Sequence, residues 1–159
     1  MSKINKKIGF IGSGNMGEVF VGALIQTGIF SSSMIYASDI SEKRLDILNK
    51  TYGISVMKDN FKLFSECEIV ILAVKPQHIY QVLSQISEHE DYQIPNRKIV
   101  ISIAAGIPLR KTFKLVGKGF NNYRKFRAGK KFDKWTQKMY EELEDVLNFS
   151  GDDNFIIEM

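Results

Sequence analysis

Short apolar runs alternate with segments of helical periodicity along the first two-thirds of the chain. The apolar runs predict β-strands at residues 7–11, 34–37, 54–56, 68–74 and 98–103. In the intervening segments apolar residues recur every three or four positions, which predicts helices at 15–27, from the cap Ser41 to Tyr52, at 60–64 and from Pro76 onward. Strands that alternate with helices in this way form a parallel sheet covered by helices. The pattern therefore predicts an α/β fold, with a mainly parallel sheet and helices on both faces.

The pattern weakens beyond Pro108. It predicts a helix at 109–115, a loop rich in glycine and cations at 117–129, an amphipathic helix at 133–148 and a last strand at 155–157. A length of 159 residues suits one domain, and 44% hydrophobic and 25% charged residues are ordinary for a folded globular protein. We therefore expect a single domain over residues 1–159.

A glycine-rich segment, Gly-Ser-Gly-Asn-Met-Gly at 12–17, joins the first predicted strand to the first predicted helix. In that position it is typical of a Rossmann-type fold, in which Gly12 makes the tight turn, Gly14 lets a pyrophosphate approach the backbone, and Gly17 lets the helix pack closely. The helix N-terminus offers N–H groups and a partial positive charge to the phosphates. The alternative is a glycine-rich turn that binds nothing. The strand before the segment and the helix after it favour an NAD(P)H site.

Asp39 ends the second predicted strand. A carboxylate at this position accepts hydrogen bonds from the adenosine ribose hydroxyls and favours NAD over NADP. Lys43 and Arg44 follow closely, and either could pair with a 2′-phosphate instead. The residues alone leave the choice of cofactor open.

Two later strands end in small residues. Ala73-Val74-Lys75-Pro76 follows one of them, and Ala104-Ala105-Gly106 follows the other. Ligands of open parallel sheets bind beyond the carboxyl ends of the strands. We therefore expect the nicotinamide end of the cofactor to lie against these two segments.

The net charge of +4 is unevenly distributed. Residues 111–138 are rich in lysine and arginine and contain a single acid, Asp133. Such a block could bind a polyanion or form a solvated face. The solvated face is the favoured interpretation, so we do not expect nucleic-acid binding.

Several other features bear on location and chemistry. No run of about 18 apolar residues predicts a membrane span, and the polar, basic residues 1–7 do not resemble a signal peptide. One cysteine, Cys67, excludes an internal disulfide and suits the cytoplasm, and with two histidines it makes a metal site unexpected. His78 could act as an acid–base group, although an exposed side chain without that role is the favoured interpretation. We therefore expect a cytoplasmic protein without a metal.

Three segments together resemble one family. They are Lys-Ile-Gly-Phe-Ile-Gly-Ser-Gly-Asn-Met-Gly at 7–17, Ile-Leu-Ala-Val-Lys-Pro-Gln at 71–77 and Val-Ile-Ser-Ile-Ala-Ala-Gly-Ile at 100–107. Their order and spacing resemble the N-terminal domain of pyrroline-5-carboxylate reductase, over residues 6–108 without a break. The family reduces the cyclic imine 1-pyrroline-5-carboxylate to proline with a hydride from NADPH or NADH. The resemblance thus implies an NAD(P)H-dependent reductase of proline biosynthesis that acts on a small cyclic imine.

The resemblance also implies site residues. Residues Ile11, Gly12, Ser13, Gly14, Asn15 and Met16 would hold the pyrophosphate, and Asn60 would lie on the adenosine side. Residues 73–76 and 104–106 would line the nicotinamide end. The resemblance favours NADPH, whereas Asp39 keeps NAD possible.

Two family features are missing from this sequence. A Met-Pro-Asn-Thr-Pro motif is absent, which suggests that a segment of about twenty residues is missing near position 112, and no C-terminal dimerisation domain follows. No residue can be assigned as catalytic, because none is identified that would hold the substrate carboxylate or protonate the imine nitrogen. The alternatives to an active reductase are therefore a non-catalytic nucleotide-binding module and an inactive reductase fragment. Self-association, or a partner chain that supplies the missing domain, would go with the first of these three readings.

Overall fold

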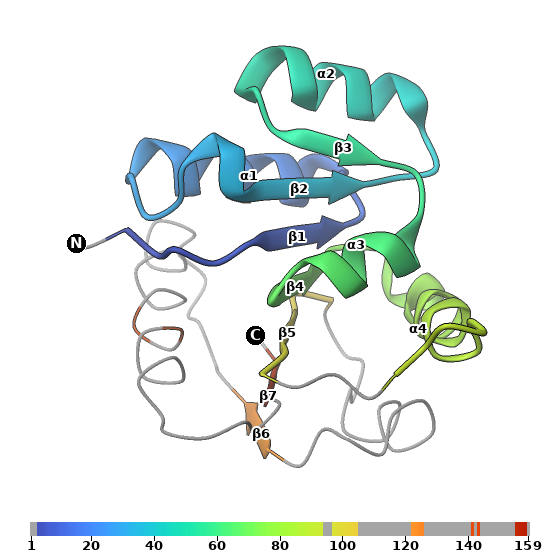
Figure 1. Ribbon diagram of the computed structural model, residues 1–159. Coiled ribbons are helices and arrows are strands. Elements are labelled where there is room, and N and C mark those ends of the chain that lie inside the picture. Colours follow the sequence, from blue (N-terminus) through green and yellow to red (C-terminus); the bar gives the residue numbers. More distant parts are fainter. Residues whose placement is uncertain are drawn as a thin grey trace.

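The computed structural model describes residues 3–93, 97–104, 122–125, 141, 143 and 155–158. Their strands form one seven-stranded sheet in the order β3-β2-β1-β4-β5-β7-β6, and every pair of neighbouring strands is parallel (Figure 1). The strand order reverses between β1 and β4. This is the arrangement of a Rossmann-type sheet, in which ligands bind beyond the carboxyl ends of the strands at that reversal.

The elements follow the predicted alternation closely. The strands are β1 (Ile8–Ile11), β2 (Ile35–Ser38), β3 (Ser55–Met57), β4 (Ile69–Leu72), β5 (Ile99–Ser102), β6 (Asn122–Lys125) and β7 (Phe155–Glu158). The helices are α1 (Asn15–Gln26), α2 (Glu42–Tyr52), α3 (Asn60–Glu66) and α4 (Ile79–Ser87), with short 3₁₀ turns η1 (Ser32–Met34) and η2 (Pro76–His78).

Local sequence signals set the ends of α2 and α3. The Ser41 hydroxyl accepts a hydrogen bond from the Arg44 N–H and so caps α2, as the sequence predicts. Gly53 ends α2 with a φ of 67°, a left-handed conformation that glycine adopts without strain. The Asp59 carboxylate caps α3 by accepting from the N–H groups of Phe61 and Lys62.

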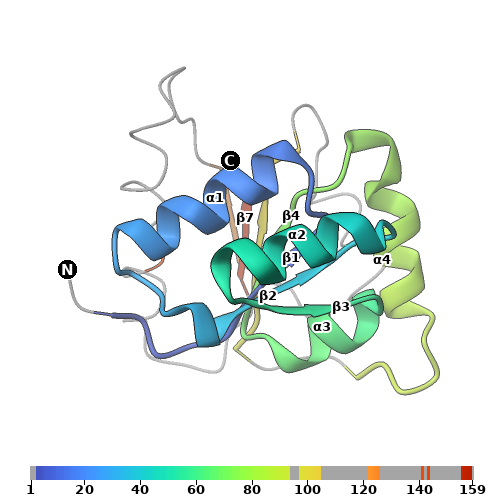
Figure 2. The ribbon, with the colours of Figure 1, turned by 90° about the horizontal axis from the view of Figure 1, so that it is seen from above.

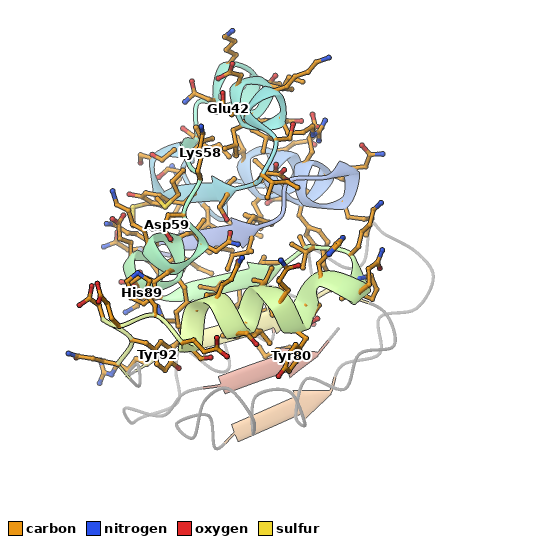
Figure 3. The ribbon with its side chains drawn as sticks, turned by 90° about the vertical axis from the view of Figure 1, so that its right-hand side faces the viewer. Glu42, Lys58, Asp59, Tyr80, His89 and Tyr92 are labelled. Carbon is orange, nitrogen blue, oxygen red and sulfur yellow. The ribbon has the colours of Figure 1, made fainter. Side chains whose placement is uncertain are left out.

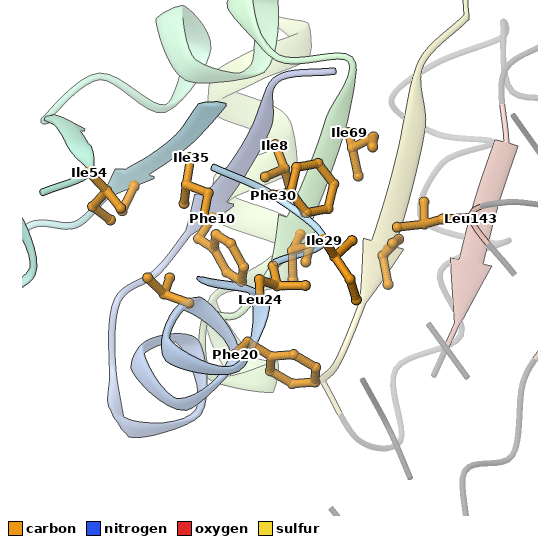
Figure 4. Packing of buried hydrophobic residues seen from close by; sticks show 14 of the residues in the cluster. Ile8, Phe10, Phe20, Leu24, Ile29, Phe30, Ile35, Ile54, Ile69 and Leu143 are labelled. Carbon is orange, nitrogen blue, oxygen red and sulfur yellow. The ribbon is translucent and has the colours of Figure 1, made fainter. Parts of the chain in front are cut away.

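Helices cover both faces of the sheet, as predicted. Seen from above, α1 lies on one side of the strands and α3 on the other (Figure 2). Alternate strand residues therefore belong to two separate cores. The core beneath α1 contains Ile8 and Phe10 of β1 together with Phe20 and Leu24 of the helix (Figure 4).

The second core lies beneath α3 and α4. It contains Ile11 of β1, and Leu63, Val82 and Leu83 of the helices. Gly9 of β1 faces the same way, and a Cβ there would lie 2.5 Å from Leu63 Cδ2. The absence of a side chain at Gly9 therefore lets α3 pack directly on the strand. With a core on each face, the ends of the strands are held rigidly enough to position a binding site.

Two predictions need correction. The segment 117–129 was expected to be a loop, but residues 122–125 form β6, which pairs with β7 at the edge of the sheet. A strand at an edge needs only one partner, and this pairing between distant segments leaves no local signal among the glycines and cations. The helix expected from Pro76 begins as the turn η2 and becomes α-helical only at Ile79. Of the helix predicted at 133–148, residues 141 and 143 are described as helical, and the remainder lies outside the described residues.

Lys98 is a buried cation in the second core. Its ammonium donates to the carbonyl oxygens of Phe64 and Cys67, which lie at the end of α3, and it also lies over the Phe64 ring. A lysine at the C-terminus of a helix satisfies carbonyls that have no partner within the helix. Burial lowers the pKa of Lys98 to about 8 and raises the pKa of the neighbouring Cys67 thiol to about 12.

These two shifts predict how stability depends on pH. Between pH 8 and 10.5 the unfolded chain binds more protons at Lys98 than the folded chain, so this lysine makes the free energy of unfolding rise with pH. From pH 9 upward Cys67 opposes it, because the folded chain keeps the thiol proton that the unfolded chain loses. Between pH 8 and 9 the wild type should gain about 1 kcal/mol relative to Lys98→Met. Urea unfolding of both proteins at these two pH values tests this, and parallel pH profiles would contradict it.

In the described part of the chain, no helix is both long and apolar enough to cross a membrane.

Candidate functional site

The glycine segment that follows β1 lies at the carboxyl edge of the sheet, between β2 and β4. Gly12 has a φ of +94°, and a Cβ there would lie 2.8 Å from the carbonyl carbon of Ala73 and from the Val74 nitrogen. Both conformation and space therefore require glycine at position 12. The close approach brings the end of β4 against the turn, so that the residues after the two strands form one surface.

Gly14 and Gly17 have different roles in this turn. A Cβ on Gly17 would lie 2.9 Å from the Gly12 carbonyl oxygen, so Gly17 lets α1 begin directly against the turn. A Cβ on Gly14 would meet no described atom within 4 Å. Gly14 is also the N-cap of α1, and among the described residues no side chain caps it. The N–H groups of the first helical turn therefore face an open approach, which suits an anion.

Asp39 connects the glycine turn to the end of β2. Its Oδ2 accepts hydrogen bonds from the Ser13 N–H and the Ser13 hydroxyl, both at 2.8 Å, and its Oδ1 accepts one from the Ser41 N–H at 2.8 Å. Ser13 itself is buried. Asp39 is thus half-buried and held in one orientation at the edge of the sheet, with its negative charge next to the glycine turn.

Arg44 of α2 contacts the same turn, and the sequence gave no signal for this contact. Its Nε donates to the Ser13 carbonyl oxygen at 2.9 Å, and its Nη2 forms an ion pair with Glu18 of α1 at 2.7 Å. Glu18 also accepts a hydrogen bond from the Tyr52 hydroxyl at 3.5 Å. The guanidinium considered above as a partner for a 2′-phosphate is therefore engaged within the protein. A pattern of hydrophobic positions cannot reveal such contacts, because they join polar residues from different elements.

The other predicted site residues are spread along the same edge. Ala73 and Val74 are half-buried after β4, and Lys75 and Pro76 are exposed. Ala104 is buried after β5, and its N–H donates to the Ser102 hydroxyl. Ala105 and Gly106 lie outside the described residues.

Asn60 begins α3 beside the end of β2. Its Oδ1 accepts a hydrogen bond from the hydroxyl of Ser38, which is fully buried, at 2.7 Å. Asn60 therefore lies at the same edge as Asp39, as the sequence predicts. Ile11 lies wholly within the core, while Asn15 and Met16 are exposed at the start of α1.

The side of the molecule toward which the arrows of β1 to β3 point carries further polar residues (Figure 3). Glu42 of α2 pairs with Lys58, which precedes the cap Asp59 of α3, and this lysine lowers the pKa of the Glu42 carboxyl. The ring of His89 stacks on Phe61 with 3.7 Å between ring centroids. These contacts fasten loops to helices. His78 is exposed in η2, and the described residues contain no group of three or more potential metal ligands.

Taken together, these features define a dinucleotide-binding domain of the Rossmann type. A tight turn on glycine, an uncapped helix N-terminus and an open space above Gly14 form a cradle that a side chain would fill and that a pyrophosphate fits. A family described as "NADP oxidoreductase coenzyme F420-dependent" matches residues 7–106, and the chain belongs to this family.

Curated relatives point in the same direction. Pyrroline-5-carboxylate reductase of Methanosarcina acetivorans is 46% identical over 105 residues, which are 66% of this chain and 37% of that protein. The same enzyme of Corynebacterium melassecola is 32% identical over 162 residues, which cover 91% of this chain and 57% of that protein. The chain thus spans well under two-thirds of the relatives it matches. The 162-residue alignment is longer than the chain itself, so it includes positions that this chain lacks.

A solved structure shares the fold. The crystal structure of Plasmodium falciparum pyrroline carboxylate reductase with NADP bound superposes with a TM-score of 0.62 at 23% identity. The match covers 99% of this chain and 59% of that chain. At this identity the similarity supports the Rossmann-like fold and nothing finer.

Proposed function

We propose that this chain is the dinucleotide-binding part of an NAD(P)H-dependent reductase of the pyrroline-5-carboxylate reductase type. The observation that carries the proposal is the glycine cradle at the N-terminus of α1, held between Asp39 and the end of β4. The 46% identity to the Methanosarcina acetivorans reductase supports the reaction class. A bound nicotinamide cofactor would supply the hydride.

Within this proposal the residues divide the cofactor between them. Gly12, Gly14 and the first turn of α1 would hold the pyrophosphate, Asp39 and Asn60 would face the adenosine ribose, and residues 73–76 with 104–106 would lie beside the nicotinamide. The buried Ser13 would act indirectly, because both its N–H and its hydroxyl are given to Asp39.

We further propose that the site prefers NADH, although the resemblance and the family description favour NADP. The Asp39 carboxylate stands where a 2′-phosphate would have to lie, and two like charges at short distance repel. The nearby Arg44 guanidinium is engaged with Ser13 and Glu18 and does not offset this repulsion. Exposed Lys43 would be the remaining cation of α2 close to a 2′-phosphate.

The variant Asp39→Ser tests this preference. Removing the carboxylate should lower the ratio of the NADPH dissociation constant to the NADH dissociation constant by about tenfold. The ratio is the informative quantity, because any loosening of the glycine turn weakens both cofactors together. Fluorescence titration with each cofactor gives the two constants. A ratio that does not change would show that Asp39 has no part in the choice.

The reductase reading is tested by turnover. Purified chain is mixed with 1-pyrroline-5-carboxylate and NADH or NADPH, and the nicotinamide absorbance is followed. Oxidation of the cofactor that requires the imine would establish an active reductase. Tight cofactor binding without turnover would favour the non-catalytic nucleotide-binding module. A folded chain that binds neither cofactor would be an inactive fragment.

Other expectations from the sequence stay predictions. They are the cytoplasmic location, self-association or a partner chain that completes the substrate site, the single domain over residues 1–159, and the lack of nucleic-acid binding by residues 111–138. Most of that basic segment lies outside the described residues.

A further inference from the structure

We infer that Arg44 is a positioning residue, which holds the Ser13–Gly14 peptide so that the Gly14 N–H faces the pyrophosphate. The inference rests on the proposed function, because it concerns how the same site is prepared for its ligand. Its starting point is that Arg44 belongs to α2, yet its guanidinium contacts the glycine turn and the first turn of α1.

The direction of the Gly14 N–H follows from peptide geometry. The described peptide bonds are trans, and in a trans peptide the C=O and N–H groups point in opposite directions. Arg44 Nε donates to the Ser13 carbonyl oxygen at 2.9 Å, so the N–H of Gly14 in the same peptide points away from Arg44. The space above Gly14 is the open part of the cradle.

The preceding peptide is held in a similar way. The Ser13 N–H donates to Asp39 Oδ2 at 2.8 Å, so the Gly12 carbonyl points to the other side, where it lies close to Gly17. Asp39 therefore fixes one peptide of the turn and Arg44 fixes the next. Without Arg44 the Ser13–Gly14 peptide would be free to rotate, because glycine tolerates a wide range of dihedral angles.

The ion pair with Glu18 gives Arg44 a second effect. Glu18 lies in the first turn of α1, where its charge is favourable for the helix but unfavourable for a bound phosphate. Arg44 Nη2 lies 2.7 Å from its carboxylate and offsets that charge. Both side chains are about three-quarters shielded from solvent, with 28% and 26% exposure, so the interaction is only partly screened.

The experiment compares Arg44→Gln with Lys43→Gln, a matched control that removes one positive charge from the same turn of α2. Arg44→Gln should weaken NADH and NADPH by the same factor, about tenfold, because the pyrophosphate is common to both. Lys43→Gln should leave NADH binding nearly unchanged. Arg44→Lys keeps the charge but lacks the guanidinium fork, so its affinity should fall between those of the wild type and Arg44→Gln. A loss confined to NADPH would overturn the inference, since it would make Arg44 the receptor of the 2′-phosphate, and so would unchanged affinity.

Two further measurements separate positioning from charge alone and from failure of the proposed function. If Arg44 only neutralised Glu18, the double variant Glu18→Gln/Arg44→Gln would recover wild-type affinity, whereas positioning predicts that binding stays weak. In the ligand-free protein, the NMR order parameter of the Gly14 N–H should fall below the value of about 0.85 typical of rigid backbone in Arg44→Gln but not in Lys43→Gln. An unchanged order parameter would overturn the inference. If the folded wild type bound no dinucleotide, the proposed function would fail, while the Gly14 order parameter would still decide the role of Arg44.

Discussion

Gly14→Val is expected to abolish binding of NADH and NADPH, with a loss of affinity of at least about a hundredfold. Valine would place its side chain in the open space above the turn, where the pyrophosphate has to approach the backbone. The backbone itself accepts the change, because Gly14 has a φ of −68° and a ψ of −171°, an extended conformation that suits β-branched residues. Calorimetric titration of the variant with both cofactors measures the loss.

The control for this variant is its own thermal stability. No described atom lies within 4 Å of a Cβ at position 14, so the melting temperature should stay close to that of the wild type. Gly14→Ala, with a smaller side chain in the same space, should weaken binding less. A stable Gly14→Val protein with wild-type affinity would show that the cofactor does not lie over this turn.

Gly12→Ala is expected to have the opposite profile, with a large effect on folding. A Cβ at this position would lie 2.8–2.9 Å from three backbone atoms of Ala73 and Val74, and the φ of +94° is strained for any residue other than glycine. Relief of the clash would require the ends of β1 and β4 to move apart. We expect the free energy of unfolding to fall by about 3 kcal/mol.

Urea unfolding followed by circular dichroism measures this change. Gly14→Ala serves as the matched control, since it adds the same methyl group two residues away in open space. Equal stability of the two variants would contradict the close packing between the glycine turn and the end of β4.

The sequence predicted the parts of the fold that depend on short-range signals. Apolar runs located β1, β4 and β5, the hydroxyl of Ser41 marked the start of α2, and Gly53 marked its end. The glycine spacing after β1 located the cradle itself. These signals are local because each reflects the geometry of one strand, one helix end or one turn.

The parts that the sequence did not predict are long-range polar contacts. Arg44 contacts Ser13 from 31 positions away, and Asp39 contacts it from 26 positions away. The carboxylate of Asp39 was predicted as a ligand for the ribose, whereas its role in holding the Ser13 N–H became visible only in the fold. Strand β6 escaped prediction for the same reason, since its partner β7 is thirty or so residues further along the chain.

The central claim is that this chain folds around a dinucleotide site, and a calorimetric titration of the purified wild-type chain with NADH and, separately, NADPH tests it most directly. We expect binding with a dissociation constant on the order of micromolar, tighter for NADH than for NADPH. Absence of binding to either cofactor, from a chain shown by circular dichroism to be folded, would contradict the claim.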